Sequence, residues 1–277
     1  MPKVLPRNQL RWHALVDTGM GRLGFRTGLV SKEEQGKRRD SVEILKELVD
    51  LEFALDCPIE FFGMCTHMAD ANSTSDYTNS QITKFKSLLK RVRAAGITVP
   101  TISTDNSAAL LTTHLMHFDP NELFSADTRG YVRIGGAIYG QRPSFPQLKA
   151  VSTLRASVRH VATLKQGESV GYDRAYIAPM NVRIATLTIG FADGYPRELG
   201  NGVGKVSIRG HMFPVTGNVC MDMSMCDVSH IDCSEGDEVI IFGDNPRVEE
   251  LAKTIGTISY EILVKVSERV NRVFYQE

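Results

Sequence analysis

The chain has 277 residues, of which 42% are hydrophobic and 23% charged, with 32 basic against 32 acidic side chains. This composition is typical of a globular protein and too apolar for a disordered one. The balanced charge gives no electrostatic basis for binding nucleic acid or a membrane surface. No apolar run approaches the roughly 18–20 residues that span a bilayer, and residues 1–13 lack the apolar centre of a signal peptide. We therefore expect a cytoplasmic protein of one large domain or two.

The cysteines favour reduced thiols over disulfides or a metal site. There are five of them, an odd number, and no two form a CxxC pair. A zinc site would need a cluster in the second half of the chain, where the candidate ligands are Cys220, Cys226, Cys233 and His230. Their spacings differ from those of known zinc motifs, so the sequence predicts no metal.

The first half of the chain alternates between strand-like and helix-like segments. Apolar runs predict strands over residues 12–17, 59–67, 97–107 and 132–140. Apolar residues at helical spacing predict helices over 41–55 and 79–96, and the AALL stretch after Ser107 predicts a short third helix. This alternation is typical of βαβ units with a parallel sheet.

The pattern changes near residue 150. Segments 154–164, 182–191, 205–215 and 237–243 alternate or run apolar between Gly, Asp and Pro, which predicts antiparallel strands. Two helix-like segments follow, near 247–255 and 258–272. The predicted fold class is α/β plus all-β, with an α/β domain over 1–150 and a β-domain over 151–277.

Polar residues with possible chemistry follow the predicted strands of the first domain, because functional groups gather at the carboxyl ends of parallel strands. They are Arg22 after Asp17, His67, Asn106 with Ser107, and Arg133 with Gly135 and Gly136. A serine hydroxyl and glycine N–H groups suit a phosphate, although single residues of this kind are more commonly part of turns. Arg133 is the most informative, since an arginine in an apolar run needs a partner or a ligand.

The β-domain adds two unusual segments. Tyr172 lies in a glycine-led turn, VGYD (170–173), and Asp222 lies among sulfur-containing residues in GNVCMDMSMCD (217–227). Tyrosines in turns and methionine runs are usually packing features. From these patterns alone, the sequence predicts an α/β plus β enzyme that binds a phosphate-bearing ligand.

Taken together and in order, the segments resemble the alanine racemase family. The matching motifs are DTGMGRLGF (17–25), THMADAN (66–72), Asn106–Ser107, RIGGAIYG (133–140), VGYD (170–173), IGFADGYPR (189–197), GNVCMD (217–222) and ISYE (258–261). The resemblance implies a TIM-type barrel that holds pyridoxal phosphate (PLP), followed by an antiparallel β-domain. It also implies a homodimer that interconverts L- and D-alanine, with each active site shared between one subunit's barrel and the other's β-domain.

The resemblance also implies roles for single residues. Arg133 corresponds to the arginine that donates to the pyridine nitrogen of PLP, and His67 to the residue that supports this arginine. The phosphate would be anchored by Ser107, Gly135, Gly136 and Tyr260. Arg22 corresponds to the arginine near the phenolic oxygen of PLP and the substrate carboxylate. Tyr172 corresponds to the catalytic tyrosine, and Met221 and Asp222 to substrate contacts, all three reaching in from the partner subunit.

One family feature has no counterpart in these residues. The second acid/base of such racemases is the Schiff-base lysine, in an AVVKANAYGHG-like motif, and nothing like it occurs here. The 150 residues before the β-domain compare with roughly 250 in a complete barrel, so we expect the C-terminal part of a racemase, with only the later half of its barrel. We expect no racemase activity from this chain alone. The alternatives are a non-catalytic PLP-binding or dimerising protein, and a racemase for another small amino acid such as serine.

Overall fold

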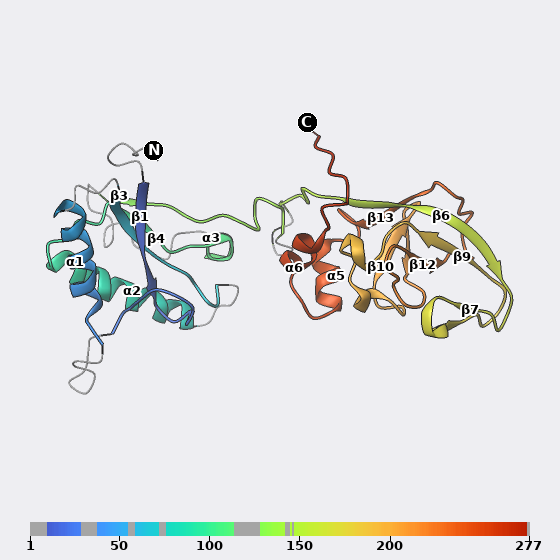
Figure 1. Ribbon diagram of the computed structural model, residues 1–277, viewed down its shortest axis with the longest axis horizontal. Coiled ribbons are helices and arrows are strands. Elements are labelled where there is room, and N and C mark those ends of the chain that lie inside the picture. Colours follow the sequence, from blue (N-terminus) through green and yellow to red (C-terminus); the bar gives the residue numbers. More distant parts are fainter. Residues whose placement is uncertain are drawn as a thin grey trace, which may run out of the picture. The chain divides into compact units, whose positions relative to one another are not determined.

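The computed structural model describes residues 10–28, 38–54, 59–71, 76–113, 128–141, 145 and 147–275. The chain forms two compact units, Met1–Gly135 and Gly136–Glu277, whose helices and strands are drawn in Figure 1. Each unit has its own hydrophobic core. The second unit includes residues 136–150, which the sequence assigns to the first domain. Each unit is described separately below.

A parallel sheet forms the centre of the first unit, with the strand order β2-β1-β3-β4-β5. The strands are β1 (Leu10–Asp17), β2 (Phe25–Arg26), β3 (Ile59–Thr66), β4 (Thr101–Ser103) and β5 (Arg129–Gly130). The parallel sheet predicted from the strand–helix alternation is therefore confirmed. Strand β4 is shorter than the predicted segment and begins after Pro100, which has no N–H to donate to a neighbouring strand.

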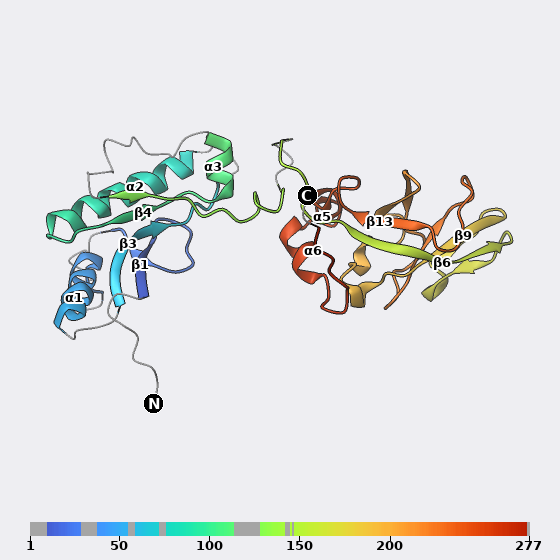
Figure 2. The same ribbon diagram turned by 90° about the horizontal axis from the view of Figure 1, so that it is seen from above.

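Two long helices, α1 (Ser41–Ala54) and α2 (Asp76–Ala94), pack their apolar sides against this sheet (Figure 2). In β1, Ala14 and Val16 are buried in the same core as Leu45 of α1 and Phe85 of α2, as the period-two alternation of a strand requires. The short α3 (Ser107–Thr113) starts where the chain leaves β4. The carboxyl ends of β3 and β4 therefore bring His67, Asn106 and Ser107 to one edge of the sheet.

The predicted strand over residues 132–140 is wrong. Arg133 makes a single parallel bridge with Asn106, and the chain turns from Gly136 onward. The turn is held by backbone hydrogen bonds from Gly140 to Ala137 (3.1 Å) and from Gln141 to Gly136 (2.9 Å). Glycine offers a strand no side chain to pack, so the Gly135–Gly136 pair interrupts the apolar run.

The second unit is built on a six-stranded antiparallel sheet in the order β11-β10-β13-β6-β9-β12. The antiparallel pairing predicted from the sequence is confirmed, whereas the strand order and the strand over Ser224–Asp227 were not predicted. Its strands are β6 (Leu154–Leu164), β9 (Val182–Leu187), β10 (Lys205–Ile208), β11 (His211–Pro214), β12 (Ser224–Asp227) and β13 (Glu238–Phe242). An isolated bridge between Val215 and Cys226 links the two ends of the sheet, which therefore nearly closes on itself. A separate hairpin of β7 (Ser169–Val170) and β8 (Tyr176–Ile177) carries the Tyr172 turn.

The predicted single strand over 205–215 is a hairpin instead. Arg209 and Gly210 adopt positive φ angles of 50° and 79°, which form the tight turn between β10 and β11. The two C-terminal helices exist as α5 (Val248–Thr254) and α6 (Ser259–Lys265), but α6 ends seven residues before the predicted limit at 272. Among the described residues, no helix is long and apolar enough to cross a membrane.

Candidate functional site

Arg133 is held from behind by the ends of two neighbouring strands. Its guanidinium donates to the carbonyl and the hydroxyl of Ser103 at the end of β4 (3.1 and 2.6 Å) and to the carbonyl of Thr66 at the end of β3 (2.6 Å). Its backbone N–H also donates to the carbonyl of Asp105 at 3.0 Å. These contacts fix the direction of a half-buried guanidinium.

His67 lies beside this cation. Its Nδ1 lies 3.4 Å from Nη2 of Arg133, and its Nε2 lies 3.5 Å from Nδ2 of Asn106. Burial lowers the pKa of His67 below its ordinary value, and the positive charges of Arg133 and Arg22 lower it further. The imidazole is therefore neutral at pH 7, with one acceptor nitrogen for either the guanidinium or the amide.

Ser107 and Gly135 form a small polar pair at the same edge of the sheet. The buried Ser107 hydroxyl accepts a hydrogen bond from the Gly135 N–H at 2.8 Å. Asn106 caps α3, because its side-chain oxygen accepts the N–H of Ala109 at 3.0 Å. Gly135 itself is exposed, and a Cβ added there would meet nothing within 4 Å. The pair thus offers a hydroxyl and a glycine backbone with open space in front of it.

Gly136 and Tyr260 come together within the second unit. A Cβ added at Gly136 would lie 2.0 Å from the hydroxyl oxygen of Tyr260, so any larger residue would require the Tyr260 ring to move. Tyr260 belongs to the first turn of α6 and is 40% exposed. A phenolic hydroxyl is thereby held against the glycine backbone that directly follows Gly135 in the chain.

Arg22 lies in the glycine-rich loop between β1 and β2. This loop is organised by Asp17, whose carboxylate accepts the N–H groups of Gly19 (3.1 Å) and Gly21 (3.0 Å). The hydrogen bond from Gly21 is the main cause that holds the pKa of Asp17 below its ordinary value. The Arg22 side chain is exposed, and its charge acts on His67. The loop therefore presents a second cation near the Arg133–His67 pair.

Tyr172, Met221 and Asp222 line one groove of the second unit, with a volume of about 660 Å³. Tyr172 and Met221 are 66% and 57% exposed. The rest of the lining is largely apolar and includes Val170, Ile184 and Met225. Tyr172 therefore shares one surface with the adjacent residues Met221 and Asp222, which follow it about 50 positions later in the sequence.

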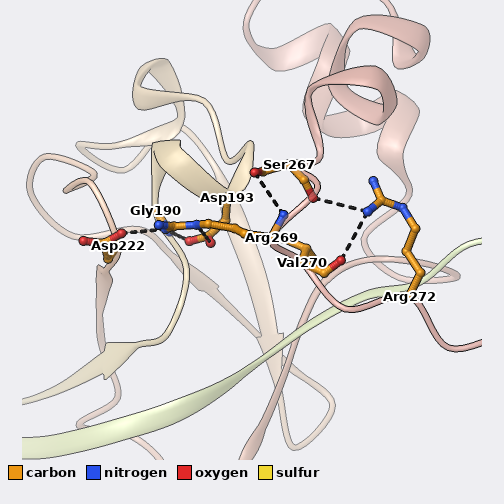
Figure 3. Close-up of polar contacts among 7 residues, drawn as sticks. All are labelled: Gly190, Asp193, Asp222, Ser267, Arg269, Val270 and Arg272. Carbon is orange, nitrogen blue, oxygen red and sulfur yellow. Dashed lines mark hydrogen bonds and ion pairs between the residues drawn. The ribbon is translucent and has the colours of Figure 1, made fainter.

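Asp222 has a partner that sequence reasoning missed. Arg269, in the segment after α6, donates through Nη2 to Asp222 (2.5 Å) and through Nε to Asp193 (2.8 Å), as Figure 3 shows. Asp193 in turn accepts the N–H of Gly190 at 2.9 Å. Arg269 is one of 32 basic residues and lies in no recognisable motif, so no sequence signal separates it from the others.

Hydrogen bonds to backbone carbonyls hold the segment that carries Arg269 in place. Arg272 donates to the carbonyls of Val266 (3.0 Å), Val270 (3.2 Å) and Ser267 (3.3 Å), the last two of which Figure 3 shows. The N–H of Ser267 donates to the carbonyl of Asp193 at 3.0 Å. Arg269 thereby joins three loops at the edge of the groove.

The predicted site residues thus fall into three groups. The first unit brings together Arg133, His67, Ser107, Gly135 and Arg22; the second unit pairs Gly136 with Tyr260 and gathers Tyr172, Met221 and Asp222 in the groove. The donor set fits the cofactor implied by the resemblance: hydroxyls and glycine N–H groups suit its phosphate, and an anchored arginine suits a ring nitrogen that accepts a hydrogen bond. The close fit of Gly136 against Tyr260 is the specific structural sign of such a cradle.

The described thiols and acidic groups do not form a metal centre. Cys65, Cys220, Cys226 and Cys233 are free, while Cys57 lies outside the described residues. Within the described parts of the chain, no three histidine, cysteine or acidic side chains are grouped so as to hold a metal ion.

Comparison with known proteins places both units in one family. The family model for the alanine racemase N-terminal domain matches residues 3–143, and that for the alanine racemase C-terminal domain matches residues 151–274. The expectation that the chain corresponds to the C-terminal part alone is therefore wrong, because the N-terminal domain model matches almost from the first residue.

Individual relatives agree. The alanine racemase of Clostridium tetani (strain Massachusetts / E88) is 32% identical over 96% of this chain and 65% of its own length. The solved alanine racemase of Clostridium difficile 630 superposes with a TM-score of 0.78 at 33% identity, over 94% of this chain and 63% of that one. The Bartonella henselae alanine racemase, solved with covalently bound pyridoxal phosphate, gives 0.73 at 28% identity, over 96% and 66%. The chain thus spans about 65% of the length of the relatives it matches.

Proposed function

The chain belongs to the alanine racemase family, and from this premise we propose that it serves the PLP-dependent interconversion of L- and D-alanine. The observation that carries the proposal is the anchored guanidinium of Arg133, held by Ser103 and Thr66 beside a neutral His67. When bound, PLP withdraws electrons from the α-carbon of an attached amino acid and so acidifies its α-hydrogen.

Arg133 donates to the pyridine nitrogen in this proposal. Because a guanidinium keeps its proton, the ring nitrogen stays unprotonated and the electron withdrawal is moderate. This favours returning a proton to the α-carbon over transamination. His67 remains neutral and adds no positive charge beside Arg133.

Four positions hold the phosphate: Ser107, Gly135, Gly136 and Tyr260. The Ser107 hydroxyl accepts the Gly135 N–H at 2.8 Å, and both groups would donate to the phosphate oxygens of bound PLP. Tyr260 adds its hydroxyl above Gly136. Arg22 contacts the substrate carboxylate, for which a guanidinium is suited by its paired N–H donors.

Tyr172 acts as the acid/base on one face of the α-carbon, and Met221 and Asp222 contact the substrate beside it in the same groove. We propose that these three residues serve the barrel of a second copy of the chain, so that the working form is a homodimer. The cytoplasmic location expected from the sequence stays a prediction.

A racemase needs a base on both faces of the α-carbon, and no segment of these 277 residues resembles the lysine motif of the family. We therefore propose that this chain by itself binds PLP without racemising alanine at a normal rate. The lack of a segment that resembles the lysine motif favours PLP binding without turnover as the second candidate function.

The test is a racemisation assay on the purified chain with PLP and L-alanine, with L-serine in a parallel reaction. We expect no D-alanine above the rate of free PLP. Formation of D-alanine at an ordinary enzymatic rate would overturn the proposal of inactivity, and a preference for serine would overturn the choice of substrate. If D-alanine forms, the Tyr172→Phe variant is expected to abolish it.

A further inference from the structure

The turn that carries Tyr172 is backbone-strained. Gly171, Asp173 and Arg174 have positive φ angles of 68°, 60° and 50°. Asp173 and Arg174 are not glycines, and such residues enter this region only when surrounding contacts hold them there. The turn is also exposed from Gly171 to Ala175, so packing of its own side chains does not hold it. Something outside the turn must fix its shape.

Two exposed contacts hold side chains of the turn, from Arg174 Nε to Ser169 Oγ (3.3 Å) and from Arg197 Nη2 to the Asp173 carboxylate (3.8 Å). The buried contacts come from the side chain of Asn218. Its Nδ2 donates to the carbonyl of Tyr172 and to the carboxylate of Asp173, both at 3.1 Å. Asn218 is only 8% exposed, and its own orientation is set by Asn201, whose Nδ2 donates to the Asn218 Oδ1 at 2.9 Å. The buried side-chain amide of Asn218 therefore donates hydrogen bonds to two successive residues of the strained turn.

Asn218 also lies on the loop that carries the other groove residues. Met221 and Asp222 follow it within four positions, and the loop is closed by a backbone hydrogen bond from Cys220 to Met223 at 2.9 Å. Gly171 fits tightly here, because an added Cβ would lie 2.9 Å from Cε of Met225. The two loops that line the groove are thus joined through this side chain.

We propose that Asn218 is a positioning residue that holds the Tyr172 turn in its strained shape and couples it to the Met221–Asp222 loop. The role attributed to Tyr172 rests on the proposed function. The geometry of the turn does not depend on it, so the two can be tested separately. The sequence gives no reason to single out Asn218, since it occurs only as the second residue of the GNVCMD motif.

The test uses residue-resolved amide hydrogen exchange on the full chain without cofactor. The N–H of Ala175 donates to the Tyr172 carbonyl at 3.3 Å and therefore reports on the turn. The N–H of Ala178 donates to the carbonyl of Glu168 at 2.8 Å and reports on the surrounding hairpin. For Asn218→Ala we expect about tenfold faster exchange at Ala175, because two hydrogen bonds are lost, and no change at Ala178.

Asn181→Ala is the matched control. Asn181 also braces a turn of this unit, since its side chain accepts the N–H of Gln166 at 3.1 Å. This variant should accelerate exchange at Gln166 and leave Ala175 unchanged. Equal acceleration at Ala175 and Ala178 in Asn218→Ala, or none at Ala175, would overturn the proposal.

Exchanging the side chains at positions 173 and 218 keeps the proposal testable if Asn218→Ala does not fold. Asn218→Asp places two carboxylates together and should accelerate Ala175 at least as much as the alanine variant. Adding Asp173→Asn restores a donor–acceptor pair with its direction reversed, and asparagine tolerates the positive φ at 173. We expect the double variant to regain part of the protection, because the hydrogen bond between positions 173 and 218 is restored while the one to the Tyr172 carbonyl is not. If it behaves like Asn218→Asp alone, the specific contact is not what holds the turn.

Should the racemisation assay show turnover, Asn218→Ala is expected to lower kcat more than it raises KM, because the Tyr172 turn loses both hydrogen bonds whereas the Met221–Asp222 loop keeps its own bond from Cys220 to Met223. If the chain proves inactive, the hydrogen-exchange result still stands. Failure of the proposed function and failure of this inference therefore produce different results.

Discussion

At the scale of single residues, the candidate site depends on groups whose ionisation and space are set by their neighbours. His67 is kept neutral by burial and by two nearby arginines, and Gly136 lies so close to Tyr260 that an added Cβ would displace the ring. Both features belong to the folded chain and give separate predictions.

The lowered pKa of His67 makes stability depend on pH. In the unfolded chain the His67 imidazole takes up a proton near its ordinary pKa of about 6.5. In the folded chain its pKa is lower, so protonation requires a lower pH. The contribution of neutral His67 to folding is therefore present above about pH 6.5 and is lost as the pH falls below that value. In His67→Gln, the drop in urea midpoint between about pH 7.5 and about pH 5.5 should be smaller than in the wild type.

His211→Gln, at an exposed position on β11, should keep the wild-type pH dependence. A His67→Gln variant that loses as much stability on acidification as the wild type would contradict the assigned role of burial at His67.

The fit of Gly136 predicts a cost for adding one methyl group. Gly136→Ala places Cβ 2.0 Å from the Tyr260 hydroxyl, so the ring must move, at about 1–3 kcal/mol in the free energy of unfolding. Gly135→Ala is the neighbouring control, because its Cβ meets nothing within 4 Å. Urea denaturation of both variants measures the difference.

Combining Gly136→Ala with Tyr260→Ala removes the obstructing ring. The cost of the Gly136 substitution should then largely disappear, as expected for two residues in contact. An unchanged cost in this background would place the clash elsewhere.

At the scale of elements, the loops at the edge of the groove depend on charge. Arg269 joins the loop that follows β9 to the loop before β12 through its bonds to Asp193 and Asp222. The ion pairs are partly exposed, so their effect on stability is small and screened by salt.

Arg269→Gln should lower the urea midpoint at low ionic strength, and the difference from the wild type should shrink when salt is added. Arg269→Lys keeps the charge but not the forked geometry of the guanidinium. Its urea midpoint at low ionic strength should therefore lie between those of Arg269→Gln and the wild type. A salt-independent difference would mean that Arg269 acts through packing rather than through its charge.

The sequence predicts most elements because their patterns are local. The alternation in β1 and the helical spacing in α2 can be recognised within one segment, and both are confirmed. The apolar run over 132–140 has the composition of a strand, yet tertiary contacts at Gly136 turn it. The β10–β11 hairpin depends on positive φ angles at Arg209 and Gly210, for which apolar periodicity gives no signal.

The site residues were predictable where a motif carries them. Arg133, Ser107 and Tyr172 lie in segments that resemble a known family, and so they could be named before the structure. Asn218 and Arg269 act through partners 46 and 47 positions away, and no local pattern records such contacts.

At the scale of the whole molecule, the chain consists of two units with separate cores, and each unit carries some of the residues named in the proposed function. Analytical ultracentrifugation of the proposed homodimer should give a molecular mass of about twice the 30.7 kDa of one chain. A monodisperse monomer that melts cooperatively at all concentrations would contradict the dimer.

The central claim is that this chain holds PLP through Arg133 and the phosphate anchors. Titration of the purified chain with PLP, followed by absorbance, tests it most directly. We predict a saturable change in absorbance for the wild type. In Arg133→Ala the affinity for PLP should be lower by about tenfold or more, because a charge-assisted hydrogen bond is lost. Tyr172→Phe should leave the binding curve unchanged. A change that never saturates, or that saturates identically in the wild type and in Arg133→Ala, would contradict the claim.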